Sequence, residues 1–74
     1  MTAYSEIVKK MATEPVYLKN SFDDIVLRSV PGNGNKFYAK VEGGTEYEIA
    51  SETDLVSDTL REALEITAEE YNAY

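Results

Sequence analysis

The residues that could do chemistry are few, because the 74-residue chain contains neither histidine nor cysteine. This absence excludes thiol catalysis, imidazole acid–base catalysis, zinc-finger sites and disulfides. Two carboxylate pairs could hold a divalent ion or exchange protons: Asp23 with Asp24, or Asp24 with Glu42. Neighbouring residues of a strand point to opposite faces, so Asp23 and Asp24 would not act together there. We interpret them as solvated charges or a helix cap.

The one glycine-rich loop with a lysine is Gly-Asn-Gly-Asn-Lys, residues 32–36. A phosphate-binding P-loop needs a longer Gly-x-x-x-x-Gly-Lys-Ser/Thr run that leads from a strand into a helix. Here no Ser or Thr follows Lys36 and a strand pattern begins, so we interpret the loop as a hairpin turn. We therefore predict a protein that is not an enzyme, with no catalytic residue, no metal and no cofactor.

Fourteen acidic residues against seven basic ones give a formal net charge of −7. Nucleic acids and anionic membranes are bound through Lys and Arg, so we expect neither as a direct partner. The sequence shows no signal-peptide pattern and no apolar run long enough to span a membrane. We expect one cytoplasmic domain over residues 1–74, with a basic protein or a second copy of the chain as its partner.

The clearest element is a β-hairpin over residues 36–50, in which apolar and polar side chains alternate. The alternating apolar side chains are Phe37, Ala39, Val41, Tyr47 and Ile49. A three-residue loop between the strands places Ala39 opposite Tyr47 and keeps every apolar side chain on one face. The same register pairs Lys40 with Glu46 on the other face.

Residues 24–30 allow two interpretations. Ile-Val-Leu-Arg-Ser-Val is rich in β-branched residues and is followed by a strong turn cluster, which favours a strand. With a five-residue loop, Leu27 lies opposite Ala39 and the inner face of the hairpin is extended. The alternative is a helix that starts near Ser21, because Phe22 and Ile25 have helical spacing. We prefer the strand.

Helical spacing of apolar residues predicts a first helix over residues 4–13, which Pro15 ends. Residues 16–21 form a connector whose backbone state the pattern does not define. A main helix begins at Ser51, where Asp54 three residues later approximates a capping box. Its buried stripe is Val56, Leu60, Ala63 and Leu64.

A second capping box, Thr67 with Glu70, predicts a break near residues 65–67 and a short final helix to about residue 73. The elements together predict an α+β domain of two layers. Its order is α-β-β-β-α with a three-stranded antiparallel meander and a short C-terminal helix, and both main helices cover one face.

Two surfaces could bind a partner. The first is the outer face of the meander, a mixed apolar and basic patch without a predicted cover. Its residues are Tyr38, Arg28, Val26 and Lys40. Tyrosine is enriched at interfaces because it joins a large apolar area to a polar tip. We therefore expect a small acidic module that binds a partner protein through this face.

The second surface is a row of carboxylates opposite the buried stripe of the main helix: Asp54, Asp58, Glu62 and Glu65. Residues three or four apart on a helix are neighbours, so the row could imitate a line of phosphates. The alternative function is thus an inhibitor that mimics nucleic acid and occupies the basic groove of a DNA- or RNA-handling protein. An ordinary solvated helix face explains the same pattern.

The segment from Glu46 to Tyr71 reads EYEIASETDLVSDTLREALEITAEEY and covers about a third of the chain. It resembles short acidic accessory proteins encoded by tailed bacteriophages in size, acidity and hairpin-helix layout. The resemblance names no family with a known activity, and no functional residue carries over. It implies a phage-infected bacterial host as the biological setting.

Overall fold

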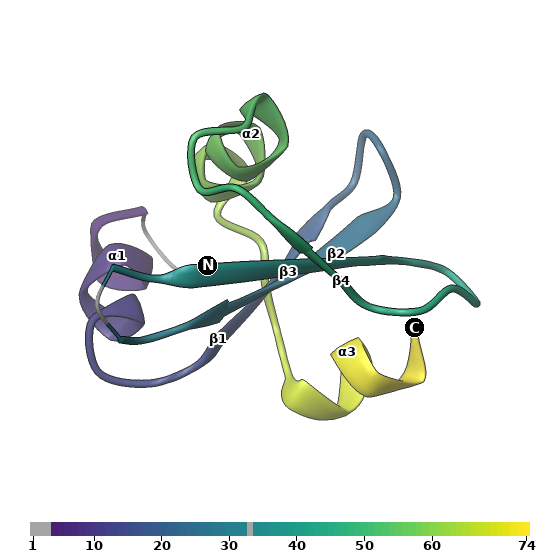
Figure 1. Cartoon of the computed structure of the whole chain (residues 1–74), viewed down its shortest axis with the longest axis horizontal. Coiled ribbons are helices and arrows are strands. Elements are labelled where there is room, and N and C mark those ends of the chain that lie inside the picture. The colour runs from purple at the N-terminus through teal and green to yellow at the C-terminus, as the bar shows by residue number, and fades with distance from the viewer. Residues whose placement is uncertain (1–3, 33) are drawn as a thin grey trace.

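A five-stranded antiparallel sheet forms the centre of the fold, in the order β4-β3-β2-β1-β5 (Figure 1). The computed structural model describes residues 4–32 and 34–74. The strands are β1 (Val16–Asn20), β2 (Ile25–Val30), β3 (Lys36–Val41), β4 (Tyr47–Ile49) and β5 (Glu65–Ile66). The helices are α1 (Tyr4–Met11), α2 (Asp54–Glu62) and α3 (Ala68–Ala73). The predicted α+β class, with its meander and short C-terminal helix, is confirmed.

The register of the meander is the predicted one. Leu27 lies opposite Ala39, and Ala39 lies opposite Tyr47 on the next strand. The strand interpretation of residues 24–30 is therefore correct. Slipping either pair by one residue would turn every buried side chain to the other face, so burial fixes this register. Asn33 of the predicted turn lies outside the described residues.

The predicted connector over residues 16–21 is wrong, because Val16–Asn20 is a strand paired with β2 on one side and with β5 on the other. Val16, Leu18 and Asn20 point inward and are buried, whereas Tyr17 and Lys19 are half-buried on the opposite face. The alternation of inward apolar and outward side chains in this strand is hard to recognise in the sequence, because the last inward residue, Asn20, is polar. The Asn20 amide is accommodated by donating to the Thr59 hydroxyl on α2, at 3.1 Å.

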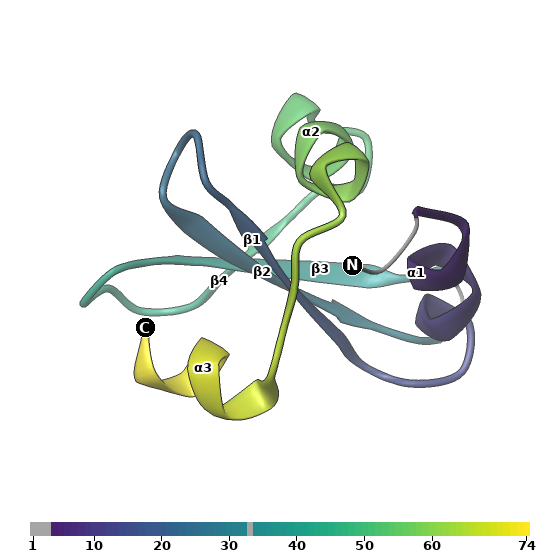
Figure 2. The same cartoon turned by 180° about the vertical axis from the view of Figure 1, so that it is seen from behind.

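Helices α1 and α2 lie side by side on one face of the sheet, as predicted (Figure 2). We call this the inner face. Its buried cluster is Ile7, Met11, Val16, Leu18, Leu27, Phe37, Ala39 and Val56. Burial of this apolar surface is the main force that holds the two layers together.

Helix α2 begins later than predicted, because its N-cap is Thr53 and not Ser51. It ends at Glu62, and the C-cap residue Ala63 adopts a left-handed conformation with φ of 54°. The predicted break then follows, occupied by β5, and the Thr67–Glu70 capping box is confirmed by both of its hydrogen bonds. The main helix is thus only nine residues long.

Helix α3 lies across the sheet from α1 and α2, against β1 and β2 (Figures 1 and 2). We call this second face the outer face. Tyr71 of α3 is buried there, with its ring centroid 5.4 Å from that of Tyr17. A left-handed residue after α2 and the two-residue β5 carry the chain from one face to the other.

Candidate interaction surface

The outer-face patch of Tyr38, Arg28, Val26 and Lys40 lies where the alternation predicted, but it is not an open surface. Val26 is fully buried, lies outside the inner cluster and belongs to β2, one of the two strands that α3 contacts. The Lys40 ammonium lies 4.8 Å from the centre of the Tyr71 ring. The expectation that this face lacks a cover is therefore wrong, because the break after α2 returns the chain to it.

The predicted pair of Lys40 with Glu46 is also replaced. Glu46 instead accepts hydrogen bonds from the Arg28 guanidinium, which stacks 4.5 Å from the centre of the Tyr38 ring. The hydrogen bond to Glu46 raises the pKa of Arg28. A planar guanidinium can bind a carboxylate and an aromatic face at once, which an ammonium does less well.

The four predicted carboxylates do not form one row. Asp54 and Asp58 are exposed on α2, and Asp58 lies 3.8 Å from Arg61. Glu62 accepts from the backbone amide and the hydroxyl of Ser21. Glu65 is on β5, beyond the end of the helix, and forms an ion pair with Lys10. The line of phosphate-like charges is therefore interrupted after Glu62.

Among the residues that the structure describes, the most exposed large apolar side chain is that of Phe22, at 94%. It lies in the turn between β1 and β2, residues 21–24, and the Asn20 side-chain oxygen accepts from the amides of Phe22 and Asp23, each at 3.0 Å. The contacts of Ser21 with Glu62 fix the other side of the turn to α2. Phe22 is thus presented to solvent by a well-bonded turn.

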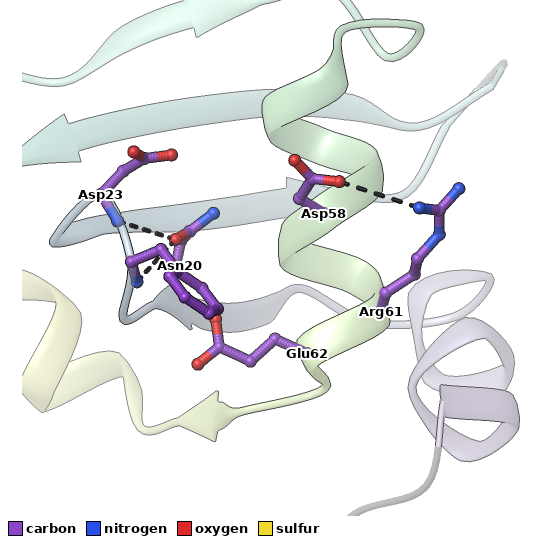
Figure 3. A pocket seen from close by; sticks show the side chains of 6 residues that line it. Asn20, Asp23, Asp58, Arg61 and Glu62 are labelled. Atoms are coloured by element: carbon purple, nitrogen blue, oxygen red, sulfur yellow. Dashed lines mark hydrogen bonds and ion pairs between the residues drawn. The ribbon is translucent and has the colours of Figure 1, made fainter.

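Beside this turn is a hollow of about 500 Å³ between the β1–β2 hairpin and the C-terminal half of α2 (Figure 3). Its lining is Asn20, Phe22, Asp23, Asp58, Arg61 and Glu62. Three carboxylates and one guanidinium give the rim a net negative charge. We call Phe22 together with this hollow the Phe22 surface.

Sequence reasoning missed the Phe22 surface. Phe22 was weighed only as part of a helix, and Asp58 and Glu62 only as parts of a charge row. A usable signal was present, since an asparagine before a short polar segment commonly binds the backbone amides that follow it. What the signal could not show is that α2 lies next to that turn.

The two candidate carboxylate pairs share Asp24. Asp24 accepts from the Tyr74 hydroxyl and lies 3.8 Å from the Lys19 ammonium, so its charge is used within the fold. Over residues 4–32 and 34–74, no group of three or more acidic side chains is placed to hold a metal ion. A second hollow, of about 390 Å³, is lined in part by the Lys10–Glu65 ion pair.

Comparison with known proteins finds no matching family model, no matching curated protein and no matching solved structure. Within the described part of the chain, every helix is too short or too polar to cross a membrane. The function must therefore be argued from the surfaces themselves.

Proposed function

We propose that this protein is a small acidic protein-binding module without catalysis, and that its partner docks on the Phe22 surface. The observation that carries the proposal is the 94% exposure of Phe22 on a turn fixed by Asn20 and Glu62. The proposed location of the protein is the cytoplasm of a phage-infected bacterial host. This places the contact on a different surface from the outer-face patch.

An exposed aromatic ring on an ordered turn is favourable for binding. Burying a phenylalanine side chain contributes roughly 1.5–3 kcal/mol, and aromatic residues dominate the energetic centres of interfaces. A turn already held by hydrogen bonds loses little conformational entropy when the partner binds.

The charge around Phe22 indicates a basic partner. Asp23, Asp58 and Glu62 outnumber Arg61 at the hollow, and the whole chain carries −7. Complementary charge accelerates encounter and orients the partner, whereas the apolar contact supplies most of the lasting affinity. A partner segment with an apolar pocket for Phe22 and a lysine or arginine beside it would fit both features.

The alternative, an inhibitor that mimics nucleic acid, is less well supported. Mimicry needs a sustained line of carboxylates, but α2 ends at Glu62 and Glu65 is paired with Lys10. Asp54 and Asp58 alone span one turn of helix. The same experiment distinguishes the two functions through their different dependence on salt.

The test is affinity capture from a bacterial lysate with wild-type protein, Phe22→Ala and Tyr47→Ala, washed at low and at high salt. Tyr47 is the control because it is an exposed aromatic residue on β4, away from the turn. We expect Phe22→Ala to lose at least about 90% of a partner that Tyr47→Ala retains, since a hot spot contributes roughly 1.4 kcal/mol or more.

Because Phe22 is exposed, its removal should change the free energy of unfolding by less than about 0.5 kcal/mol, which denaturant unfolding verifies. A partner that is insensitive to Phe22 but lost at high salt and on Asp58→Lys would favour the nucleic-acid mimic. If the captured material is the chain itself and depends on Phe22, the module is a homodimer. Proteins captured equally by all variants would contradict both functions.

A further inference from the structure

The geometry points to a second binding surface, a slot on the outer face that α3 occupies as a displaceable internal ligand. We propose that a partner segment carrying an aromatic side chain next to acidic residues replaces α3 in this slot. The proposal does not rest on the Phe22 surface, which lies on another part of the molecule.

The slot has a defined chemistry. Tyr17 provides the aromatic wall, and the Lys40 ammonium lies over the ring of Tyr71 at 4.8 Å. Lys19 lies 5.4 Å from the centre of the Tyr74 ring, and Arg28 lies on the same face. Three of the seven basic residues of an otherwise acidic chain are thus gathered here. Asp24 and Glu46 offset two of these charges, through Lys19 and Arg28, so cation–π contact favours an aromatic occupant more strongly than charge favours an acidic one.

The present occupant matches that chemistry. Tyr71 follows Glu69 and Glu70 directly in the sequence, and it is the buried residue of α3. The chain therefore shows what kind of segment the slot accepts, namely an acidic turn of helix with one aromatic ring directed at the sheet.

Several features make α3 weakly held. The helix has six residues, and among the described residues the Tyr71 hydroxyl is buried without a hydrogen-bond partner. An unsatisfied buried hydroxyl opposes docking. The pKa of Tyr71 is raised, first by burial and then by the Glu46 carboxylate, while Arg28 lowers it. The hydroxyl therefore stays neutral, next to the Arg28 guanidinium and the Glu46 carboxylate.

The remaining attachments of α3 are at its C-terminal end and are partly exposed. The Gly43 amide donates to the Tyr74 carbonyl at 2.7 Å, and the Tyr74 hydroxyl donates to Asp24. The Lys40 ammonium donates to the Asn72 carbonyl at 3.4 Å. These bonds join the C-terminal end of α3 to the β1–β2 turn, to the β3–β4 turn and to strand β3, and water can replace each of them when α3 leaves.

The first test is native-state hydrogen exchange on the full-length wild-type chain. The Tyr71 amide donates to Thr67 within α3, so its exchange reports local opening of that helix. We expect it to exchange at least about 100-fold faster than the amides of β2, by an opening that denaturant hardly affects. Exchange at the β2 rate would mean that α3 leaves only on global unfolding, and would overturn the proposal.

Tyr71→Phe sharpens this test without a risk of misfolding, because it removes only the unpaired hydroxyl. We expect α3 to open less often in Tyr71→Phe than in the wild type. Faster opening would show that the hydroxyl contributes a stabilising bond, which contradicts a weakly held helix.

The second test supplies the occupant in trans. The probe is an acetylated peptide with the sequence of residues 67–74, added to Tyr71→Ala and to wild-type protein and followed by NMR shifts of Tyr17 and Tyr38. A tethered segment acts at an effective concentration of roughly millimolar, so we expect binding at least about tenfold tighter to Tyr71→Ala. A peptide with alanine in place of its first tyrosine is the control and should not bind.

Equal binding of both peptides, or none to a Tyr71→Ala variant that retains the wild-type sheet spectrum, would overturn the proposal. If Tyr71→Ala does not fold, the exchange measurements on wild type and Tyr71→Phe decide alone. A wild-type dimer that exchanges α3 between two copies would assign the slot to a second copy of the chain and overturn the partner segment.

Discussion

The two faces of the sheet are covered in different ways. Two helices cover the inner face and bury a continuous aliphatic and aromatic cluster. One short helix covers the outer face, where tyrosine rings meet lysine and arginine side chains. Both faces bury a valine almost completely, Val16 inside and Val26 outside.

This difference indicates that the inner face stabilises the fold, whereas the outer face can exchange its contacts. Apolar packing on the inner face is lost only when the domain unfolds, because contact with water cannot replace the buried contacts between apolar side chains. On the outer face, long cationic side chains pack their apolar stems while their charged ends stay near water. Such contacts can be replaced by a partner or by solvent, so we expect the outer face to be the adaptable one.

The largest effect is expected on the inner face. Leu18→Ala should lower the free energy of unfolding by about 3 kcal/mol, within the usual 2–5 kcal/mol for a buried leucine. Leu64→Ala is the control, because Leu64 is 42% exposed, and it should cost less than about 1 kcal/mol. Urea unfolding measures both, and similar values for the two variants would contradict the assigned core.

The valine pair compares the two faces directly. Val16→Ala should cost roughly 2 kcal/mol, from two buried methyl groups and the cavity they leave. Val26→Ala should cost about 1 kcal/mol less, because α3 can settle into the space. Calorimetry or urea unfolding of both variants checks this. An equal or larger cost at Val26 would mean that the outer face is packed as tightly as the inner one.

High pH should loosen the outer face first. The hydrogen bond to Asp24 raises the pKa of Tyr74 to about 12. An unfolded tyrosine ionises near pH 10, so this stabilisation is complete below pH 10 and disappears as the pH rises from 10 to 12. Tyr74→Phe should therefore lose less stability than wild type between pH 9 and pH 11.5. Parallel pH profiles for the two proteins would contradict the hydrogen bond.

The smallest effect concerns the Arg28–Glu46 pair. Glu46→Gln should lower the free energy of unfolding by about 0.5–1 kcal/mol, because the pair is partly exposed, and the loss should shrink in 1 M salt. Glu48→Gln on the same half of the hairpin is the control and should be nearly neutral. A loss for Glu46→Gln that does not depend on salt would indicate packing instead of charge.

Much of the fold could be predicted, and for local reasons. The register between Ala39 and Tyr47 follows from alternation, and the break at Thr67 follows from a capping box four residues long. Each of these signals is complete within a few neighbouring residues. The first strand was missed because its alternation ends in Asn20, whose polarity is accommodated only by Thr59 of a distant helix.

The candidate surfaces were harder to predict for the same reason. The outward direction of Tyr38 and Arg28 was correct, since strand alternation sets it. Their cover was not predicted, because no local pattern states on which face a six-residue helix will dock. Glu46 was predicted to pair with Lys40, its cross-strand neighbour on β3. Its partner is instead Arg28 on β2, one strand further away.

By itself, the sequence determined most of the elements, the register of the meander, the acidic charge and the absence of imidazole and thiol side chains. These depend on residue type and on spacing over a few positions. The tertiary structure alone decided that α3 seals the outer face and that α2 lies beside the turn that exposes Phe22. Contacts between segments distant in sequence depend on the combined packing of all the layers, which no single stretch of the chain encodes.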